Sequence, residues 1–388
     1  MTCGDILNVI VLNWRDSDNP LAGGAEVVVS NQCRGLARLG HTVTLFTSRF
    51  PGSEQVSDVD SYRVVRQGGR FTSFLAAVSK IKRSWDKLRP DALIENINGV
   101  PWFGPIWSEV PVLGCLYHRV GPFFFREVPP PIAMLGFAAE AAMPKVYRDT
   151  PMTCLGATTK REFVKMGFRE EQLFELNPGV DHDLFRPGVA SSKDEIFVLP
   201  GPLKRYKRPE IAVWALNEIR DEFPRVGLLL TGSARGETAL VLARLISRLG
   251  LADRVRLAGY VSEQVKASLF QKCLAVIYCS TAEGWGLATL EAAACGTPAI
   301  VPDSTGLLDA VSPGRTGLFY RTGDVKSLAG AMRTLLRSPD LVRTLGENAL
   351  EVSSTFTWER YSEKFEEILL DLLLTQRVGP MVGGSRSQ

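Results

Sequence analysis

The chain has 388 residues, of which 45% are hydrophobic and 22% are charged, an ordinary composition for a folded globular protein. At roughly 100–200 residues per domain, the length predicts two domains. The formal net charge of +3 is too small for a protein that binds nucleic acid through a basic surface, so we expect no nucleic-acid partner.

The N-terminal segment and the cysteines indicate where the protein works. The apolar run at 6–14 is interrupted by Asn8 and Asn13 and is shorter than the roughly 20 residues that span a bilayer. It also lacks the basic start and the small-residue cleavage site of a secretory signal. The seven cysteines form no Cys-x-x-Cys pair, which is typical of reduced cytosolic thiols and excludes a disulfide scaffold and a structural zinc site. We therefore expect a cytoplasmic protein.

Short apolar runs alternate with longer amphipathic segments along the whole chain, a pattern typical of a parallel sheet wrapped by helices. In chain order, the first half predicts strands at 7–14, 42–48, 62–66, 92–95, 112–118 and 152–157. The second half predicts strands at 196–200, 226–231, 255–258, 274–280 and 299–302, followed by helices at 325–336, 341–353 and 358–374. The fold class is therefore α/β, with two Rossmann-like parallel-sheet domains.

A concentration of Pro, Gly, Asp and Ser at 177–192 marks a linker between the two halves. We predict one Rossmann-like domain at 1–185, a second at 186–355, a helix at 356–376 that packs back on the N-terminal domain, and a flexible tail at 377–388. Ligands of doubly wound sheets bind outside the carboxyl ends of the strands, so residues that directly follow strands are the candidates for function.

Two Asp-x-Asp triplets, Asp16-Ser17-Asp18 and Asp181-His182-Asp183, have the form of a metal-binding motif. The first precedes Pro20 and the second precedes Pro187, so turn and capping chemistry explains both, and we expect no catalytic metal. The sequence contains neither a GxGxxG after its first strand nor a P-loop, which disfavours a nicotinamide or flavin cofactor.

One predicted helix carries a row of basic residues with a tryptophan: Lys80, Lys82, Arg83, Trp85, Lys87 and Arg89. Such a helix could make a peripheral contact with an anionic membrane surface. A solvated helix face is the favoured alternative, because the charges of residues 1–185 balance at 20 Lys and Arg against 20 Asp and Glu.

The segment after the strand at 274–280 has the form of an anion-binding turn. Gly284 and Gly286 let backbone amides approach a ligand closely, and a helix of Leu and Ala follows until Gly296. The N-terminus of that helix presents unpaired N–H groups with a partial positive charge. This segment therefore predicts a site for a diphosphate.

Two glutamates, Glu283 and Glu291, flank this turn. Because a carboxylate is unfavourable beside phosphate oxygens, we interpret each as a hydrogen-bond acceptor for the hydroxyls of a ribose or a hexose. The alternatives are a loop charge for Glu283 and a solvated helix residue for Glu291. The nearly all-apolar helix at 287–295 disfavours an exposed position for Glu291.

This Glu-x7-Glu block strongly resembles the signature of the retaining glycosyltransferases of family 4, which have the GT-B fold of two Rossmann-like domains facing across a cleft. Four further motifs support the resemblance, in the expected order over about residues 5 to 375: Gly23-Gly24-Ala25-Glu26, Asn177-Pro178-Gly179-Val180-Asp181, Leu203-Lys204-Arg205-Tyr206-Lys207-Arg208 and Gly314-Arg315-Thr316-Gly317-Leu318. The resemblance identifies a family and does not identify a substrate.

The resemblance implies a donor-binding role for the second domain. Glu291 would hold the ribose hydroxyls, and Glu283 would contact the transferred sugar as a catalytic residue. Lys207 would neutralise the diphosphate, where charge develops as the glycosidic bond breaks. The loop and the helix start would complete the site with Gly284, Gly286 and the amides of Leu287 and Ala288, and we add Val261 to the predicted donor-binding residues.

One position departs from the family pattern. The family usually places an arginine directly after the strand glycine, whereas Pro202, with neither charge nor N–H, follows Gly201 here. Lys204 or Arg205 is predicted to supply the missing cation. The alternative is that both belong to a solvated basic turn.

The resemblance assigns an acceptor-binding role to the first domain. His118, at the end of the strand at 112–118, matches a family histidine that bonds the donor sugar; the alternative is a packed structural histidine. Gly23 and Gly24 would approach the donor phosphates from across the cleft. The aromatic run Phe123, Phe124 and Phe125 is predicted to bind the acceptor, although such rings are also common in hydrophobic cores.

We predict a retaining, metal-independent hexosyltransferase that needs no cofactor. It would move a hexose-type sugar from a UDP-sugar or GDP-sugar to a hydroxyl of a small-molecule, lipid or glycan acceptor. Two alternatives remain: a sugar-nucleotide epimerase, and a non-catalytic nucleotide-sugar-binding partner of another transferase, which Pro202 keeps open.

Overall fold

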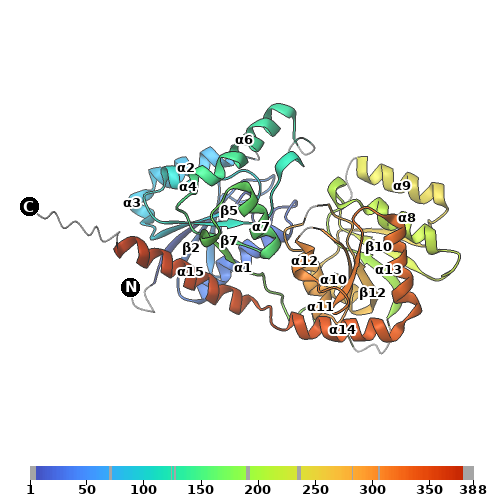
Figure 1. Cartoon of the computed structure of the whole chain (residues 1–388). Helices are drawn as coiled ribbons and strands as arrows, with labels where there is room; N and C mark the ends of the chain where they lie inside the picture. The colour runs from blue at the N-terminus through green and yellow to red at the C-terminus, as the bar shows by residue number, and fades with distance from the viewer. Residues whose placement is uncertain are drawn as a thin grey trace, which may run out of the picture. The chain divides into compact units, whose positions relative to one another are not determined.

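The chain forms two α/β units in a computed structural model, which describes residues 6–69, 72–123, 125, 128–188, 193–233, 237–281, 283–304 and 306–378 (Figure 1). Residue contacts group Met1–Leu155, Lys160–Asn177 and Glu359–Gln388 into unit 1. Unit 2 consists of Gly156–Thr159 and Pro178–Trp358. The domain limits drawn from the sequence stay predictions, and the predicted tail at 377–388 lies, beyond Val378, outside the described residues.

Unit 1 is built on a sheet with the strand order β3-β4-β2-β1-β5-β6-β7-β8. Neighbouring strands are parallel except for the β3–β4 hairpin. The strands are β1 (Asn8–Leu12), β2 (Thr42–Thr47), β3 (Val56–Val59), β4 (Tyr62–Arg66), β5 (Ala92–Ile97), β6 (Val112–Leu116), β7 (Met152–Cys154) and β8 (Leu173–Glu175). The helical segments are α1 (Gly24–Arg38), α2 (Ser73–Arg83), α3 (Trp85–Leu88), α4 (Gly104–Trp107), η1 (Gly121–Phe123), α6 (Pro130–Val146), α7 (Ala157–Met166), η2 (Glu170–Gln172) and α15 (Trp358–Val378).

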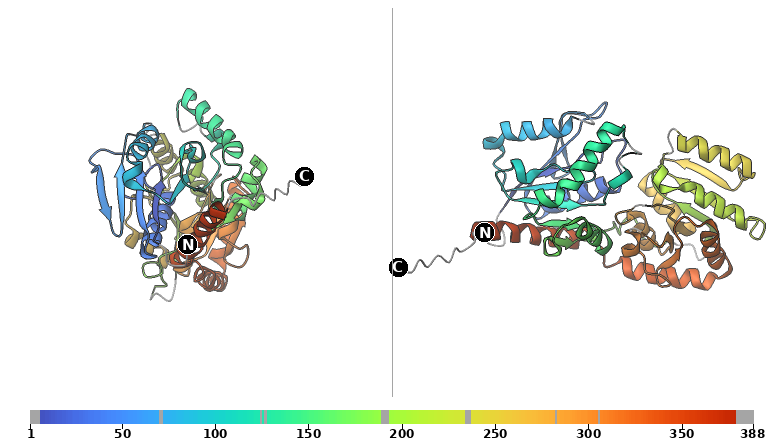
Figure 2. Two further views of the ribbon diagram at one scale, coloured as in Figure 1. Left: turned by 90° about the vertical axis from the view of Figure 1, so that its left-hand side faces the viewer. Right: turned by 45° about the horizontal axis from the view of Figure 1, so that its top comes forward.

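Helices cover both faces of the sheet in unit 1. Ile10 and Leu12 of β1 pack with Ala77 and Ile81 of α2 in one core cluster, which α3 and α4 extend. Because side chains alternate along a strand, the other residues of β1 point to the opposite face. Figures 1 and 2 show α15 beside α1 there. A Cβ on Gly35 of α1 would overlap the Ser362 side chain of α15, so the two helices are in close contact.

Unit 2 has a fully parallel sheet with the strand order β11-β10-β9-β12-β13-β14. Its strands are β9 (Asp194–Leu199), β10 (Gly227–Thr231), β11 (Val255–Gly259), β12 (Cys273–Ile277), β13 (Ala299–Pro302) and β14 (Gly317–Tyr320). Its helical segments are η3 (Arg205–Lys207), α8 (Pro209–Ile219), α9 (Glu237–Leu249), α10 (Glu263–Lys272), α11 (Leu287–Ala294), α12 (Leu307–Ala310), α13 (Val325–Arg337) and α14 (Pro339–Ser353). One core cluster joins the sheet to α8, α9 and α13, and a second joins it to α10, α11 and α12.

The sequence prediction of two parallel α/β sheets is confirmed, and the structure adds β3, β8 and β14 to the predicted strands. These strands have three or four residues, too few for an alternating pattern to be recognised. The predicted basic helix at 80–89 is wrong as a single element, because it breaks at Ser84 into α2 and α3. Arg89 then ends α3 in a left-handed conformation, with φ of 39°. No helix among the described residues is both long and apolar enough to cross a membrane.

A buried carboxylate fixes the loop that follows β5. Glu95 is fully buried in that strand and accepts hydrogen bonds from the amides of Trp102 and Gly104 and from the Tyr147 hydroxyl. Burial raises the pKa of Glu95 to about 7, although these three donors oppose the shift. Three donors around one carboxylate hold the loop and α6 against the sheet.

Replacing Glu95 by Gln should change how stability depends on pH. Since the folded-state pKa is about 7 against an ordinary value of 4.5, the folded protein binds this proton more tightly than the unfolded chain does. The contribution of Glu95 to the free energy of unfolding therefore falls as pH rises from about 4.5 through about 7. At about 1.4 kcal/mol per pKa unit the fall is roughly 3 kcal/mol, and the Glu95→Gln variant should lack it.

Urea denaturation of the wild-type, Glu95→Gln and Glu109→Gln proteins across this pH range measures the effect. Glu109 is exposed, so its variant should keep the wild-type pH dependence. The same pH dependence in the Glu95→Gln and wild-type proteins would contradict the assignment.

Candidate active site

Two of the predicted donor-binding residues, Lys207 and Glu283, lie in direct contact in unit 2. Lys207 Nζ is 3.0 Å from Glu283 Oε1, and the two side chains are only 11% and 14% exposed. Ser280 donates a hydrogen bond of 2.8 Å to the same carboxylate oxygen. Burial disfavours the charged form of Lys207, but the Glu283 carboxylate outweighs burial and the pKa of the ammonium group is raised. The Lys207 ammonium group therefore keeps its charge despite its burial.

Local backbone geometry brings this pair together after strands β9 and β12. Gly201 adopts φ of 95°, a conformation that favours glycine, and turns the chain beyond β9 toward η3. The Thr281 amide beyond β12 donates to the Tyr206 carbonyl at 3.0 Å. This backbone bond joins the two loops, so that Lys207 and Glu283 meet at the carboxyl edge of the sheet.

The glycine turn after Glu283 is closely packed by the loop after β13. The Gly306 amide donates to the Glu283 carbonyl at 2.9 Å, and a Cβ on Gly306 would overlap the Gly284 carbonyl group. Gly286 forms the N-cap of α11 with φ of 83°. Leu287 and Ala288 begin α11, and the Ala288 amide bonds the Tyr278 hydroxyl, whose pKa burial raises well above its usual range.

Glu291 is buried on α11 and pairs with a lysine that the sequence analysis did not single out. Lys266 Nζ of α10 lies 2.8 Å from Glu291 Oε2 and 2.7 Å from Glu263 Oε2. The ammonium group also lies 5.2 Å from the centre of the Phe185 ring. Burial raises the pKa of Glu291, and Lys266 opposes that shift. The alternative of a solvated helix position for Glu291 is excluded by its 8% exposure.

The three other predicted donor-binding side chains lie outside the two buried ion pairs of unit 2. Val261 is half-buried between β11 and α10. Lys204 and Arg205 are exposed, and Lys204 Nζ lies 5.8 Å from the centre of the Tyr206 ring. Lys207, not these two residues, is the buried cation that pairs with Glu283.

A short segment from the first half of the chain holds the glycine turn in place. The Thr158 amide and hydroxyl donate to the Asp309 carboxylate at 2.7 and 2.9 Å, and the Thr159 hydroxyl donates to the Gly284 carbonyl at 3.2 Å. The sequence analysis missed these contacts because they join residues 125 to 151 positions apart.

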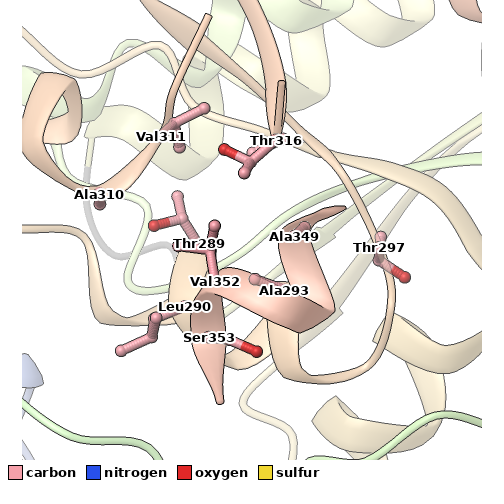
Figure 3. Close-up of a pocket in the computed structure, with 11 residues that line it drawn as sticks. Thr289, Leu290, Ala293, Thr297, Ala310, Val311, Thr316, Ala349, Val352 and Ser353 are labelled. Carbon is pink, nitrogen blue, oxygen red and sulfur yellow. The ribbon is translucent and has the colours of Figure 1, made fainter. Parts of the chain in front are cut away.

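The packing beneath α11 leaves little free volume. A cavity of about 10 Å³ lies between α11, α14 and the segment after α12, lined by Thr289, Ala293, Val311 and Val352 among others (Figure 3). This is about the volume that one water molecule needs, so the side chains between α11 and α14 pack with little free space.

The predicted residues of unit 1 lie after β1 and β6. His118 is half-buried and lies two residues beyond β6, which ends at Leu116. The loop beyond it is fixed by Glu140, which accepts the Val120 and Gly121 amides at 2.7 Å each. Gly23 precedes α1, and its amide donates to Glu26 Oε2 at 2.7 Å.

Of the three predicted aromatic residues of unit 1, Phe123 and Phe125 lie among the described residues and Phe124 does not. Phe123 ends η1, and Phe125 is 49% exposed, with its ring centre 6.2 Å from that of Phe137. Gly24 begins α1. His118, Gly23, Gly24 and the aromatic run belong to unit 1, whereas Lys207, Glu283 and Glu291 belong to unit 2.

The aspartate triplets make the predicted turns, and the first also makes an ion pair. The Asp16 carboxylate accepts the Asp18 amide at 2.9 Å and pairs with buried Arg66 at 2.7 Å, while Asp18 pairs with Arg66 at 2.9 Å. Asp181 accepts the Asp183 amide at 3.1 Å. Both carboxylates of the first triplet thus pair with the one guanidinium group of Arg66.

Comparison with known proteins gives two family matches. Residues 22–184 match Glycosyltransferase Family 4, and residues 181–352 match Glycosyl transferases group 1. The chain is 33% identical over 199 residues to D-inositol 3-phosphate glycosyltransferase 2 of Catenulispora acidiphila, a match that covers 47% of each chain. It is 27% identical over 388 residues to D-inositol 3-phosphate glycosyltransferase 1 of the same organism, with 90% of each chain covered.

Solved structures show the same fold. Sucrose-phosphate synthase from Thermosynechococcus elongatus superposes with a TM-score of 0.81 at 22% identity, over 94% of this chain and 99% of that one. Anabaena HepE in complex with UDP and glucose superposes with a TM-score of 0.76 at 19% identity, over 94% of this chain and 100% of that one.

Replacing Gly306 by Ala should destabilise the protein because the new methyl group would overlap the Gly284 carbonyl. Overpacking of this kind costs about 1–3 kcal/mol. Gly330→Ala in α13 is the matched control, since nothing lies within 4 Å of a Cβ there. Alanine in place of a helical glycine adds up to about 1 kcal/mol of stability. Thermal unfolding compares the two variants, and a wild-type midpoint for Gly306→Ala would disprove the close backbone approach.

Proposed function

The chain belongs to glycosyltransferase family 4, with the GT-B fold, and on that premise we propose that it transfers a hexose from a nucleoside-diphosphate sugar to an acceptor hydroxyl with retention of anomeric configuration. The observation that carries the proposal is the buried ion pair of Lys207 and Glu283 beside the glycine turn at the carboxyl edge of the unit 2 sheet. The related HepE structure contains UDP and glucose, which favours a UDP-sugar as the donor.

Unit 2 provides the groups that a nucleotide sugar requires. We propose that the Lys207 ammonium group exchanges its contact with Glu283 for the donor diphosphate and neutralises the charge that develops on the leaving group. Glu283 is then available to accept hydrogen bonds from the sugar hydroxyls. The first amides of α11 add partial positive charge, and Glu291 accepts the ribose hydroxyls. Since these groups carry the positive charge, we propose that the reaction is metal-independent.

Lys204 and Arg205 are exposed, and either could supply the positive charge that the family arginine, replaced here by Pro202, would provide. A diphosphate that has Lys207 and the α11 amides needs less help from a second cation. We propose that Lys204 or Arg205 reaches the outer side of the diphosphate, because both precede Lys207 in the same turn. Val261 would lie beside the nucleotide, between β11 and α10.

In the proposed reaction the acceptor hydroxyl approaches the face of the sugar from which the diphosphate leaves. The bond between the anomeric carbon and the phosphate oxygen breaks, the bond to the acceptor oxygen forms, and the acceptor proton passes to the departing phosphate. His118 of unit 1 bonds the donor sugar, and Gly23 and Gly24 approach the phosphates. Phe125, whose side chain is 49% exposed, is the member of the aromatic run that we propose to contact the acceptor.

The acceptor is proposed to be a small hydroxylated molecule. The relatives that match at 27–33% identity are named D-inositol 3-phosphate glycosyltransferases, and the longer of the two matches spans both units. The two other acceptor classes predicted from the sequence, lipids and glycans, remain to be compared in the same assay.

The central test is an assay with UDP-glucose or GDP-glucose and a panel of polyol acceptors. We expect a product with retained anomeric configuration by proton NMR, activity in the presence of EDTA, and slow donor hydrolysis without acceptor. Glu283→Gln and His118→Ala should each lower the transfer rate by about 100-fold or more, as expected for groups that contact the reacting sugar. Glu218→Gln, an exposed position on α8, is the control and should be unaffected.

Other outcomes of this assay would identify the alternatives. An inverted anomer contradicts the mechanism, and inversion at C2 of the donor identifies an epimerase. Binding of the donor without turnover identifies a non-catalytic partner. Full activity in both site variants would exclude the proposed roles of Glu283 and His118.

Lys266→Met should weaken nucleotide binding near neutral pH. Without the ammonium group, burial and the neighbouring Glu263 raise the pKa of Glu291 further, and a neutral carboxyl is a poorer acceptor for two ribose hydroxyls. We expect an affinity for UDP or GDP about tenfold lower at pH 7 that recovers as pH rises. Lys266→Arg, which keeps the charge, should retain most of the affinity. Isothermal titration calorimetry at several pH values measures this, and a loss that does not vary with pH would indicate that Lys266 acts by packing alone.

A further inference from the structure

A pocket of about 290 Å³ lies in unit 1, formed by α6, the end of α7 and the loop after β6. Its volume is close to the lower end of the range for small-molecule sites, about 300–1,000 Å³. It is lined by Arg119, Phe137, Glu140, Ala141, Lys165 and Met166. None of these six residues belongs to the proposed donor site.

The one carboxylate in this pocket is already occupied by backbone donors. Glu140 is 3% exposed, and its two oxygens accept the Val120 and Gly121 amides at 2.7 Å each. Burial raises the pKa of Glu140, although these amides and Arg119 oppose the shift. Gly121 has φ of 51°, a conformation that favours glycine, so the chain turns directly after these two amides. Glu140 therefore fixes the loop and has little remaining capacity to bind a ligand.

The two cations of the pocket have most of their hydrogen-bonding capacity left. Arg119 Nε is 3.9 Å from Glu140 Oε2, too far for a hydrogen bond, and the Arg119 side chain is 47% exposed. Lys165 is exposed, and within the described part of the chain no carboxylate lies within 4.0 Å of its ammonium group. The pocket therefore has two positively charged side chains and one carboxylate, and that carboxylate already accepts two backbone amides. This balance of charge favours binding of an anion.

The remaining lining is apolar. Phe137, Ala141 and Met166 provide a wall on which the carbon face of a sugar, a polyol ring or an acyl chain can pack. An anion such as chloride would leave this wall unused, whereas a phosphomonoester on a carbon skeleton would use both kinds of surface.

The position of the pocket connects it with the proposed reaction. Arg119 directly follows His118, and consecutive Cα atoms are about 3.8 Å apart. Because Glu140 holds the next two residues, this loop has a fixed geometry at the end of β6. The anchoring cation Arg119 therefore belongs to the same fixed loop as the histidine that is proposed to contact the donor sugar.

We propose that this pocket binds a phosphate group carried by the acceptor, with Arg119 and Lys165 as its ligands and Phe137 and Met166 against the carbon skeleton. The proposal rests on the acceptor role of unit 1 described above and names the chemical class of the acceptor. The phosphate can be that of a soluble polyol phosphate or that of a lipid headgroup.

Binding of two probes to the full chain tests the proposal without any donor present. The soluble probe is glycerol 3-phosphate, measured by isothermal titration calorimetry. The lipid probe is phosphatidylcholine vesicles with and without phosphatidic acid, measured by co-sedimentation. The variants are Arg119→Gln, Lys165→Gln and their combination, and Lys145→Gln is the control because Lys145 is an exposed cation on α6 outside the pocket.

We expect the wild-type protein to bind one probe, and the double variant to bind it at least about tenfold more weakly, as for loss of two charge-assisted contacts. Lys145→Gln should bind like the wild type. Binding of the soluble probe identifies a polyol phosphate, and binding only to vesicles with phosphatidic acid identifies a lipid headgroup. If Arg119→Gln does not fold, Lys165→Gln alone, at an exposed position, still reports on the pocket.

Two results would overturn the proposal: no binding of either probe, or binding that the double variant and the control weaken equally. The proposed function is tested separately by thermal stabilisation of the wild-type protein with UDP-glucose or GDP-glucose. Donor binding without phosphate binding rejects the pocket alone, and phosphate binding without donor binding rejects the transferase proposal alone.

Discussion

A carboxylate removed from water must be matched by a cation or by several N–H donors, and both units of this protein are organised around such carboxylates. In unit 2, Glu283 and Glu291 are each matched by a lysine, Lys207 and Lys266. In unit 1, Glu95 and Glu140 are matched mainly by backbone amides. Glu95, Glu140 and Glu283 each lie beside a strand end or hold a loop that follows one, and Glu291 lies on α11, which follows the glycine turn. The loops at the carboxyl edges of both sheets therefore have defined shapes.

The two ways of matching charge have different consequences for function. A carboxylate bound by backbone amides cannot release them without rearranging the loop, so Glu95 and Glu140 serve to fix the chain. A lysine side chain is flexible and can exchange one anion for another. The pairs in unit 2 are therefore the ones whose cation can change partners when an anion enters, and the glycine turn beside Glu283 is held by the Gly306 amide and the Thr159 hydroxyl.

Much of the fold could be predicted from the sequence because each core strand and helix has its own local pattern of apolar residues. β1, β9 and β12 have five or six residues, most of them apolar, and a parallel sheet buries both faces of such strands. β4 was predicted, but its hairpin partner β3 was missed because β3 is short and half-exposed at the sheet edge. The turn between the two strands places Asp60 at φ of 52°. The break between α2 and α3 was missed because the spacing of the basic residues is the same whether the segment forms one helix or two.

The sequence by itself determined the spacing of Glu283 and Glu291, the glycines between them and the position of Lys207, because these depend on one turn and one short helix. Only the tertiary structure decided which partner each carboxylate has. Lys266 reaches Glu291 from a different helix, and Thr158 reaches Asp309 across 151 positions of the chain. Such partners are set by how elements pack, and residues distant in the sequence leave no periodic pattern that identifies them as neighbours. The same reason kept the pocket at Arg119 and Lys165 out of the sequence prediction, since its walls come from α6, α7 and a loop that only the folded sheet brings together.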